Sequence, residues 1–306
     1  MSNLQQGFQG ADEPTAAASL FRWLELADAQ PHIQEIKRRM LALGPVGAGD
    51  RVLDVGCGIG LEATRLAGRV GQVGRVVGID KSAQMIAEAR SRTFDAGLLQ
   101  IEYAVMDARR LEFPDGAFDL CRAERVLRYV ERPERAVREM ARVVRPGGRV
   151  VAFDFDSDAT VIDAPDPTLV RRIREILDAA VPNCWMGRQL PRLFRQAGLD
   201  DISVVPQVVM IPSLESYRRL VQGSLDAAVR SGVLATGDLD RWWTDLARAE
   251  LEGGIFVANL GFVVHGRRPG SPGAQHGGAG WKSRPKSTPE VSKPTPNERK
   301  DGHEQQ

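Results

Sequence analysis

One short stretch limits what this chain can fold into more than any other: an apolar, strand-like run that passes directly into a glycine-rich loop. It reads VLDVGCGIG over residues 52–60, and a helical pattern opens at Leu61. Glycine tolerates positive φ and lets a ligand approach the backbone closely. The helix that follows presents free N–H groups and the positive end of its dipole, which suit an anion. The stretch therefore predicts a strand–loop–helix unit with a ligand seated on the turn.

Two other interpretations of the loop stay open at this point: a tight turn that binds nothing, and a dinucleotide site. The dinucleotide fingerprint is G-x-G-x-x-G, whereas Gly56, Gly58 and Gly60 are spaced as G-x-G-x-G. Asp54 stands directly before the loop. Its carboxylate there can brace the loop or meet an ammonium group, but it would repel a pyrophosphate.

Around this unit, short apolar runs alternate with helical patterns, which is typical of a parallel sheet with crossover helices. We predict strands over Arg51–Val55, Arg75–Asp80, Ile101–Val105, Phe118–Arg122, Arg149–Phe155, Ile202–Val209 and Ile255–Gly266. We predict helices over Leu61–Val70, Ser82–Ala96 and Pro133–Val144, the last ended by Arg-Pro-Gly-Gly. The fold class is therefore α/β, with a Rossmann-like seven-stranded sheet, helices on both faces and a helical lid.

The domain organisation follows from the same patterns. Residues 1–50 are predicted as an N-terminal helical cap, and residues 51–266 as the ligand-binding domain with lid insertions at about 157–198 and 212–254. Loops at the carboxyl edge of a parallel sheet are where such folds build ligand pockets. Residues 267–306 are rich in Gly, Pro, Ser and Lys and lack apolar periodicity, so we expect a disordered tail.

Composition narrows the classes of partner. The net charge of +1 provides no broad field for nucleic acid, so no nucleic-acid partner is expected. No apolar run approaches the length of a membrane span, and the N-terminus lacks a secretory pattern. The three cysteines are odd in number and far apart, which predicts no disulfide framework and no metal site. Together these features favour a cytoplasmic protein that is a monomer or homodimer.

A second acid, Asp80, stands at the end of the next predicted strand. Twenty residues after Gly60, the predicted strand Val76–Ile79 ends in Asp80. A carboxylate at the end of this strand can accept hydrogen bonds from both hydroxyls of a ribose.

Five motifs now stand in order along the chain: VLDVGCGIG, the strand-end Asp80, Met106-Asp107-Ala108, FPDGAFD over residues 113–119, and the helix from Glu134 to the RPGG turn. As a set, over about Arg51 to Val151, they resemble the type 11 (UbiE-type) methyltransferases. These are class I enzymes that use S-adenosylmethionine (SAM) as methyl donor. The resemblance implies SAM as cofactor and a small-molecule acceptor.

The resemblance also implies a role for particular residues. Asp54, Gly56 and Gly58 would line the methionine end of SAM, within a loop completed by Cys57 and Gly60. Asp80 would hold the ribose, and Asp107 with the backbone of Ala108 would read the adenine. Three further candidates are Lys81 and Met85 beside the adenosine, with exposed and core interpretations open for both, and Glu124 near the methyl group.

The acceptor side departs from the family. Many relatives carry histidine or glutamine in the loop after the fourth strand, where this chain reads Val126-Leu127-Arg128-Tyr129-Val130. No catalytic base is therefore carried over, and the catalytic residue is left unassigned. From the residues alone, His32, Tyr129 and Asp156 are candidates.

The prediction is an enzyme that methylates O, N or C of a small molecule, in secondary metabolism. Two alternatives remain: a SAM-binding fold used for cyclisation or decarboxylation without methyl transfer, and a noncatalytic partner subunit.

Overall fold

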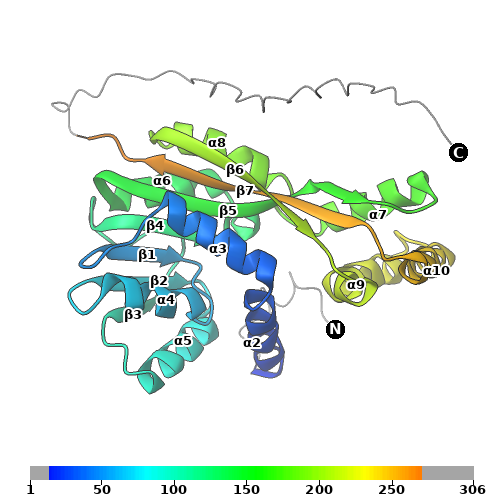
Figure 1. The fold of residues 1–306 in the computed structure, drawn as a ribbon, viewed down its shortest axis with the longest axis horizontal. Helices are drawn as coiled ribbons and strands as arrows, with labels where there is room; N and C mark the ends of the chain where they lie inside the picture. Colours follow the sequence, from blue (N-terminus) through cyan, green and yellow to red (C-terminus); the bar gives the residue numbers. More distant parts are fainter. Residues whose placement is uncertain (1–13, 271–306) are drawn as a thin grey trace, which may run out of the picture. The chain divides into compact units, whose positions relative to one another are not determined.

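The computed structural model describes residues 14–270, and its framework is a seven-stranded sheet with the strand order β3-β2-β1-β4-β5-β7-β6 (Figure 1). The strands are β1 Arg51–Val55, β2 Arg75–Asp80, β3 Ile101–Val105, β4 Phe118–Glu124, β5 Val144–Ile162, β6 Asp200–Met210 and β7 Val257–Arg267. β1 to β5 pair in parallel, and β7 runs antiparallel between β5 and β6. The predicted α/β class with a seven-stranded sheet is confirmed. The predicted tail lies outside the described residues from residue 271 onward.

Helices cover both faces of the sheet because alternate strand residues point to opposite sides. Val52 of β1 joins a core with α3 (Pro31–Leu43), α4 (Leu61–Val70) and α5 (Ala83–Asp95). Its neighbour Leu53 joins the opposite core with α6 (Pro133–Val143) and α8 (Met186–Gln196). The carboxyl ends of β1, β2 and β4 are thus held between two packed layers.

Local capping explains where several helices begin. The hydroxyl of Ser82 accepts a hydrogen bond from Met85 N–H at the start of α5. Asp166 accepts two backbone hydrogen bonds at the start of α7 (Pro167–Ala179), and Ser213 caps α9 (Leu214–Arg230) in the same way. Each side chain satisfies N–H groups that the helix leaves unpaired.

The long antiparallel strands differ from the sequence prediction. β5 was expected to end at Phe155 but runs to Ile162, because Val161 and Ile162 pair with Ala258 and Val257 of β7. The stretch from residue 157 therefore begins as strand, and α8 packs against β5, β6 and β7. Three helices of the two segments predicted as lid insertions lie together. α9 contacts both α7 and α10 (Thr236–Glu252). Their role as a lid stays a prediction.

Two helices precede the sheet, α2 (Pro14–Asp28) and α3 (Figure 1). Leu20 of α2 packs in a small core with Ile59 of the glycine loop and Met85 of α5. The part of the predicted cap that the structure describes thus contacts the loop directly. No helix within residues 14–270 is long and apolar enough to cross a membrane.

Candidate functional site

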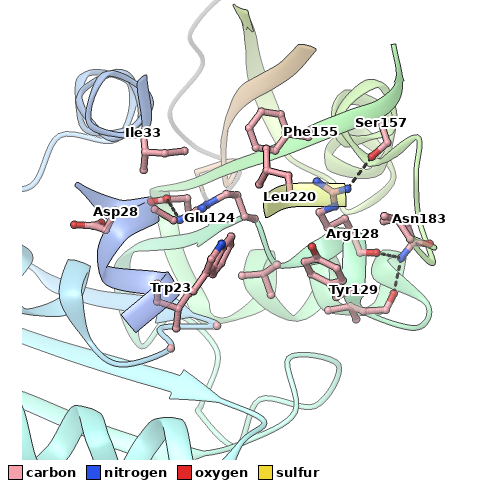
Figure 2. Close-up of a pocket in the computed structure, with 18 of the residues that line it drawn as sticks. Trp23, Asp28, Ile33, Glu124, Arg128, Tyr129, Phe155, Ser157, Asn183 and Leu220 are labelled. Carbon is pink, nitrogen blue, oxygen red and sulfur yellow. Dashed lines mark hydrogen bonds and ion pairs between the residues drawn. The ribbon is translucent and has the colours of Figure 1, made fainter. Parts of the chain in front are cut away.

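A cavity of about 1180 Å³ opens at the carboxyl ends of β1, β2 and β4. Side chains of α2, α3, α7 and α9 complete its walls. Figure 2 shows Trp23 and Glu124 on one side of this cavity, with Ser157 and Asn183 on the other. Its volume lies slightly above the usual range for small-molecule sites, roughly 300–1,000 Å³.

The glycine loop forms one end of the cavity, and its conformation requires glycine. Gly56, Gly58 and Gly60 have φ of 68°, 53° and 78°, in the left-handed region that other residues rarely adopt. A Cβ on Gly56 would lie 2.4 Å from Val126 Cγ2, so the loop after β4 closes tightly over it. At Gly58 a Cβ would meet only Leu24, at 3.8 Å. The backbone at Gly58 therefore stays open to the cavity.

Asp80 lies at the end of β2 and organises the turn. Its Oδ2 accepts a hydrogen bond from Gly58 N–H at 3.0 Å, and its Oδ1 accepts one from Ser82 N–H at 2.9 Å. An ionised carboxylate only accepts hydrogen bonds, and its two oxygens together offer about four lone-pair sites. Asp80 lines the cavity. The arrangement fits a diol that would hydrogen-bond to the carboxylate from the cavity side.

The next segment along the cavity wall contains Asp107 and Ala108. Asp107 Oδ2 lies 2.7 Å from Arg109 Nη2, and Arg109 also pairs with Glu131. Hydrogen bonds from Arg109 lower the pKa of Asp107, with burial opposing them. Asp107 is therefore ionised at neutral pH and acts as a hydrogen-bond acceptor.

A buried group of charges forms the floor below the glycine loop. Lys37 Nζ lies 3.3 Å from Asp28, 3.0 Å from Glu62 and 2.6 Å from Glu124. Arg122, only 2 % exposed, pairs with Glu62 at 2.5 Å and with Glu124 at 2.8 Å. We call these five residues the buried charge cluster.

Of this cluster, only Glu124 was predicted from the sequence. Lys37 is one of two lysines in the chain before residue 267, which is the one signal that sets it apart. Arg122 had no signal beyond being a charge at the end of a predicted strand.

Asp54 lies beside the cluster but keeps more distance from it. Its Oδ1 is 3.7 Å from Arg122 Nε. Burial raises the pKa of Asp54 to about 6, and Arg122 offsets only part of this. For Glu62, burial acts in the same direction, but Arg122 and Lys37 outweigh it and lower the pKa to about 2. The difference follows from contact: Glu62 touches two cations and Asp54 touches none closely.

The structure brings most of the predicted cofactor residues to this one cavity. Ten of the eleven line it; Gly60 is the exception and forms the N-cap of α4 behind the loop. Met85 is also part of the small core beneath α2, and Lys81 is exposed at the rim. Their roles toward a cofactor stay predictions.

The three candidate catalytic residues do not all lie in the cavity. His32 and Tyr129 line the cavity, whereas Asp156 does not. Asp156 is 1 % exposed and pairs with Arg188, and it accepts a hydrogen bond from Arg188 N–H at 2.9 Å. Because its carboxylate is taken up by Arg188, Asp156 is not available as a base.

His32 is half-buried, and burial and the charge of Arg125 lower its pKa. The imidazole is therefore neutral at pH 7 and able to accept a proton.

Comparisons with known proteins agree with this geometry. A family model described as a methyltransferase domain, type 11, matches residues 53–152. An uncharacterised 37.1 kDa protein in a transposon of Streptomyces fradiae is 36% identical over 219 residues, 71% of this chain and 62% of that protein. The phosphatidylethanolamine N-methyltransferase of Cereibacter sphaeroides is 40% identical over 152 residues, 49% of this chain and 73% of that protein.

Among solved structures, the YcgJ protein of Bacillus subtilis has a TM-score of 0.53 at 19% identity, covering 76% of this chain and 97% of that one. At this level of identity, the likeness shows a shared fold only.

A parallel sheet with an antiparallel β7 and a glycine loop at the end of β1 defines a class I methyltransferase fold. The chain belongs to the type 11 methyltransferase family, whose members use SAM as methyl donor, and the predicted resemblance is confirmed.

Proposed function

We propose that this protein transfers the methyl group of SAM to an O, N or C atom of a small-molecule acceptor. The observation that carries the proposal is one continuous cavity, lined at one end by the glycine loop and Asp80 and elsewhere by side chains of α7 and α9. A donor and an acceptor need to meet in such a space, shielded from water. We extend the proposal to a secondary metabolite as acceptor, because the two helical insertions provide a pocket larger than the donor requires.

The residues present fit SAM. The open backbone at Gly58 and the nearby Asp54 suit the methionine end, which carries an ammonium and a carboxylate. Asp80 suits the ribose hydroxyls, and Asp107 with Ala108 suits the adenine edge. Asp54 lines the cavity beside the loop, and its carboxylate, whose pKa is about 6, carries a negative charge at neutral pH that disfavours a pyrophosphate. This supports SAM over a dinucleotide.

Bound SAM supplies a methyl group that is already activated on a sulfonium. The protein's contribution is then orientation, for which alignment alone contributes roughly 7–11 kcal/mol in favourable cases. Leu24 of α2 packs beside the loop and forms part of the cavity wall at this end. For an oxygen or nitrogen acceptor, the neutral His32 is the proposed proton acceptor, with Tyr129 as a second candidate.

The proposal includes a cytoplasmic protein that is a monomer or homodimer. Cys57, Cys121 and Cys184 are free thiols, which suits a reducing compartment. The net charge of +1 gives no support to a nucleic-acid acceptor.

The first test is a calorimetric titration with SAM and with S-adenosylhomocysteine. We expect both to bind, and Asp80→Ala to raise the Kd of SAM by about ten- to a hundredfold, because hydrogen bonds to a charged group are worth about 1.5–3 kcal/mol. Asp95→Ala, at an exposed position at the end of α5, is the matched control and should leave Kd unchanged. Absence of binding by the wild type would contradict the proposal. Mass spectrometry of acceptor mixtures incubated with SAM then looks for a product heavier by one CH₂ unit.

A further inference from the structure

Away from the glycine loop and Asp80, which form the donor end of the cavity, apolar side chains form a larger part of the wall. The apolar side chains there come from β5, from α7 and the turn after it, and from α9: Phe155, Ile162, Leu177, Val181, Leu220 and Val221. Polar side chains, among them Ser157, Thr160 and Asn259, lie between these apolar ones, so the walls suit a ligand with an apolar body and some polar groups.

Arg128 projects into this apolar part. Its Nη2 donates a hydrogen bond to Ser157 Oγ at 2.7 Å, and its guanidinium carbon lies 5.4 Å from the Tyr129 ring centroid and 6.0 Å from that of Phe155. Figure 2 shows the side chain between Tyr129 and Ser157, with Leu220 beside it. Nε is buried without a partner. Nη1 makes no hydrogen bond to the described residues and, unlike Nε, is not covered by protein atoms.

The charge of Arg128 is not neutralised by an ion pair. Within residues 14–270 no carboxylate lies within ion-pair distance of it, whereas most other cations of the cavity are paired, as Arg125 is with Glu124 and Arg174 with Asp158. Lys81 and Arg132 also form no ion pair within the described part of the chain, but both are exposed to solvent. Arg128 differs from these two because it is half-buried against aromatic rings.

One acid shares this part of the cavity. Asp178 of α7 lines it, and burial, followed by the charge of Asp158, raises the pKa of Asp178. Asp178 nevertheless forms no ion pair with Arg128, so the guanidinium stays available to an anionic group of a ligand.

The backbone that carries Arg128 is fixed from two sides. Asp154 Oδ2 accepts a hydrogen bond from Leu127 N–H at 2.9 Å. Asn183 Nδ2 donates to the carbonyl oxygens of Leu127, Arg128 and Val130 at 3.1, 3.3 and 2.8 Å. A guanidinium held on such a loop is positioned before any ligand arrives, and this lowers the ordering cost of binding.

We infer that the acceptor part of the cavity recognises an amphiphilic organic anion. Its carboxylate or phosphate group binds the guanidinium of Arg128, and its apolar body lies against Phe155, Leu177 and Leu220. The planar guanidinium suits both anions because it donates parallel N–H bonds to two oxygens. This inference deepens the proposed function by naming the class of acceptor. It rests on that function only in taking the bound anion to be the molecule that is methylated.

The test measures binding without SAM and without turnover, so its outcome is separate from that of the proposed function. Calorimetry at about pH 7.5, where carboxylates are ionised, compares four probes with the same apolar chain: decanoate, decyl phosphate, decanol and decyltrimethylammonium. We expect decanoate and decyl phosphate to bind at least about tenfold more tightly than decanol or the cation, since hydrogen bonds to charged groups are worth about 1.5–3 kcal/mol. The tighter of the two anions identifies the group that the acceptor carries.

Variants assign the preference to one residue. Arg128→Gln should remove the difference between decanoate and decanol, while Arg248→Gln, at an exposed position of α10 outside the cavity, should retain it. If the Gln variant does not fold, Arg128→Lys keeps a charge at the site and should keep part of the preference. Equal binding of decanoate and decanol by the wild type would overturn the inference. So would tighter binding of the cation, or an unchanged preference in a folded Arg128→Gln.

Discussion

Lys37 illustrates how a single residue holds the site together. Its ammonium is buried among Asp28, Glu62 and Glu124, at 8 % side-chain exposure. A buried charge is tolerated only when it is paired, and each member of the buried charge cluster depends on the others for that. The cluster also joins the end of α2 and the middle of α3 to the end of β4, directly beneath the donor end of the cavity.

We predict that Lys37→Met lowers the free energy of unfolding by about 3–5 kcal/mol, because it removes one of the two cations from a cluster with three buried carboxylates. Urea unfolding measures the effect. Arg38→Met is the matched control: its guanidinium is 69 % exposed and pairs with Glu35 on the surface, so the change should stay below about 1 kcal/mol. Equal losses in both variants would mean that burial of Lys37 carries no special cost.

At the level of elements, the unit β1–loop–α4 depends on glycine at some positions and not at others. Gly56 has positive φ and lies under Val126, so a side chain there would both strain the backbone and displace the loop after β4. Gly68 lies inside α4, where a Cβ would meet nothing within 4 Å and φ is not positive. The same substitution should therefore have opposite effects at the two positions.

We predict that Gly56→Ala destabilises the protein by roughly 1–3 kcal/mol and weakens SAM binding, from the strain at positive φ. Gly68→Ala should stabilise it by roughly 0.4–1 kcal/mol, because alanine reduces the entropy of the unfolded chain. Thermal unfolding of both variants, with SAM titrations, makes the comparison. If Gly56→Ala changed neither the stability nor the affinity for SAM, Val126 would have to move aside without cost.

At the level of the whole molecule, the buried acids make folding stability depend on pH. The folded protein keeps the proton of Asp54 up to about pH 6, whereas the unfolded chain releases it near the ordinary value of 3.8. The folded state therefore binds more protons between these values, and the stability that Asp54 contributes is lost as the pH rises through about 6. Glu62 acts in the opposite direction, since its lowered pKa of about 2 contributes stability that is lost below its ordinary value of 4.5.

Comparing Asp54→Asn with the wild type isolates the first effect. We predict that the stability of the variant relative to the wild type is about 1–2 kcal/mol more favourable at pH 7.5 than at pH 5, because one pKa unit corresponds to about 1.36 kcal/mol. Urea unfolding at the two pH values is the measurement. A difference of the opposite sign would indicate that Asp54 is ionised in the folded protein at pH 5.

Local signals were sufficient for the central part of the fold. The bounds of β1, β2, β3 and α4 coincide with the prediction, because each apolar run or helical pattern ends at a clear breaker or charge. β5 was predicted too short because Asp156 and Asp158, which follow Phe155, resemble the charges at a strand end. Asp154 and Asp156 are instead 1 % exposed, and β7 pairs with the strand as far as Ile162. Pairing between distant segments is not visible in local periodicity.

The candidate site divides in the same way. The sequence by itself determined the glycine loop, Asp54 and Asp80, because a strand–loop–helix unit needs only a few neighbouring residues to define its geometry. Only the tertiary structure decided that Lys37 meets Glu124, 87 positions away, and that Arg128 lies against two aromatic rings and forms no ion pair with any residue from 14 to 270. Burial and charge pairing depend on how separate elements pack, and this is why the donor end was predictable and the acceptor end was not.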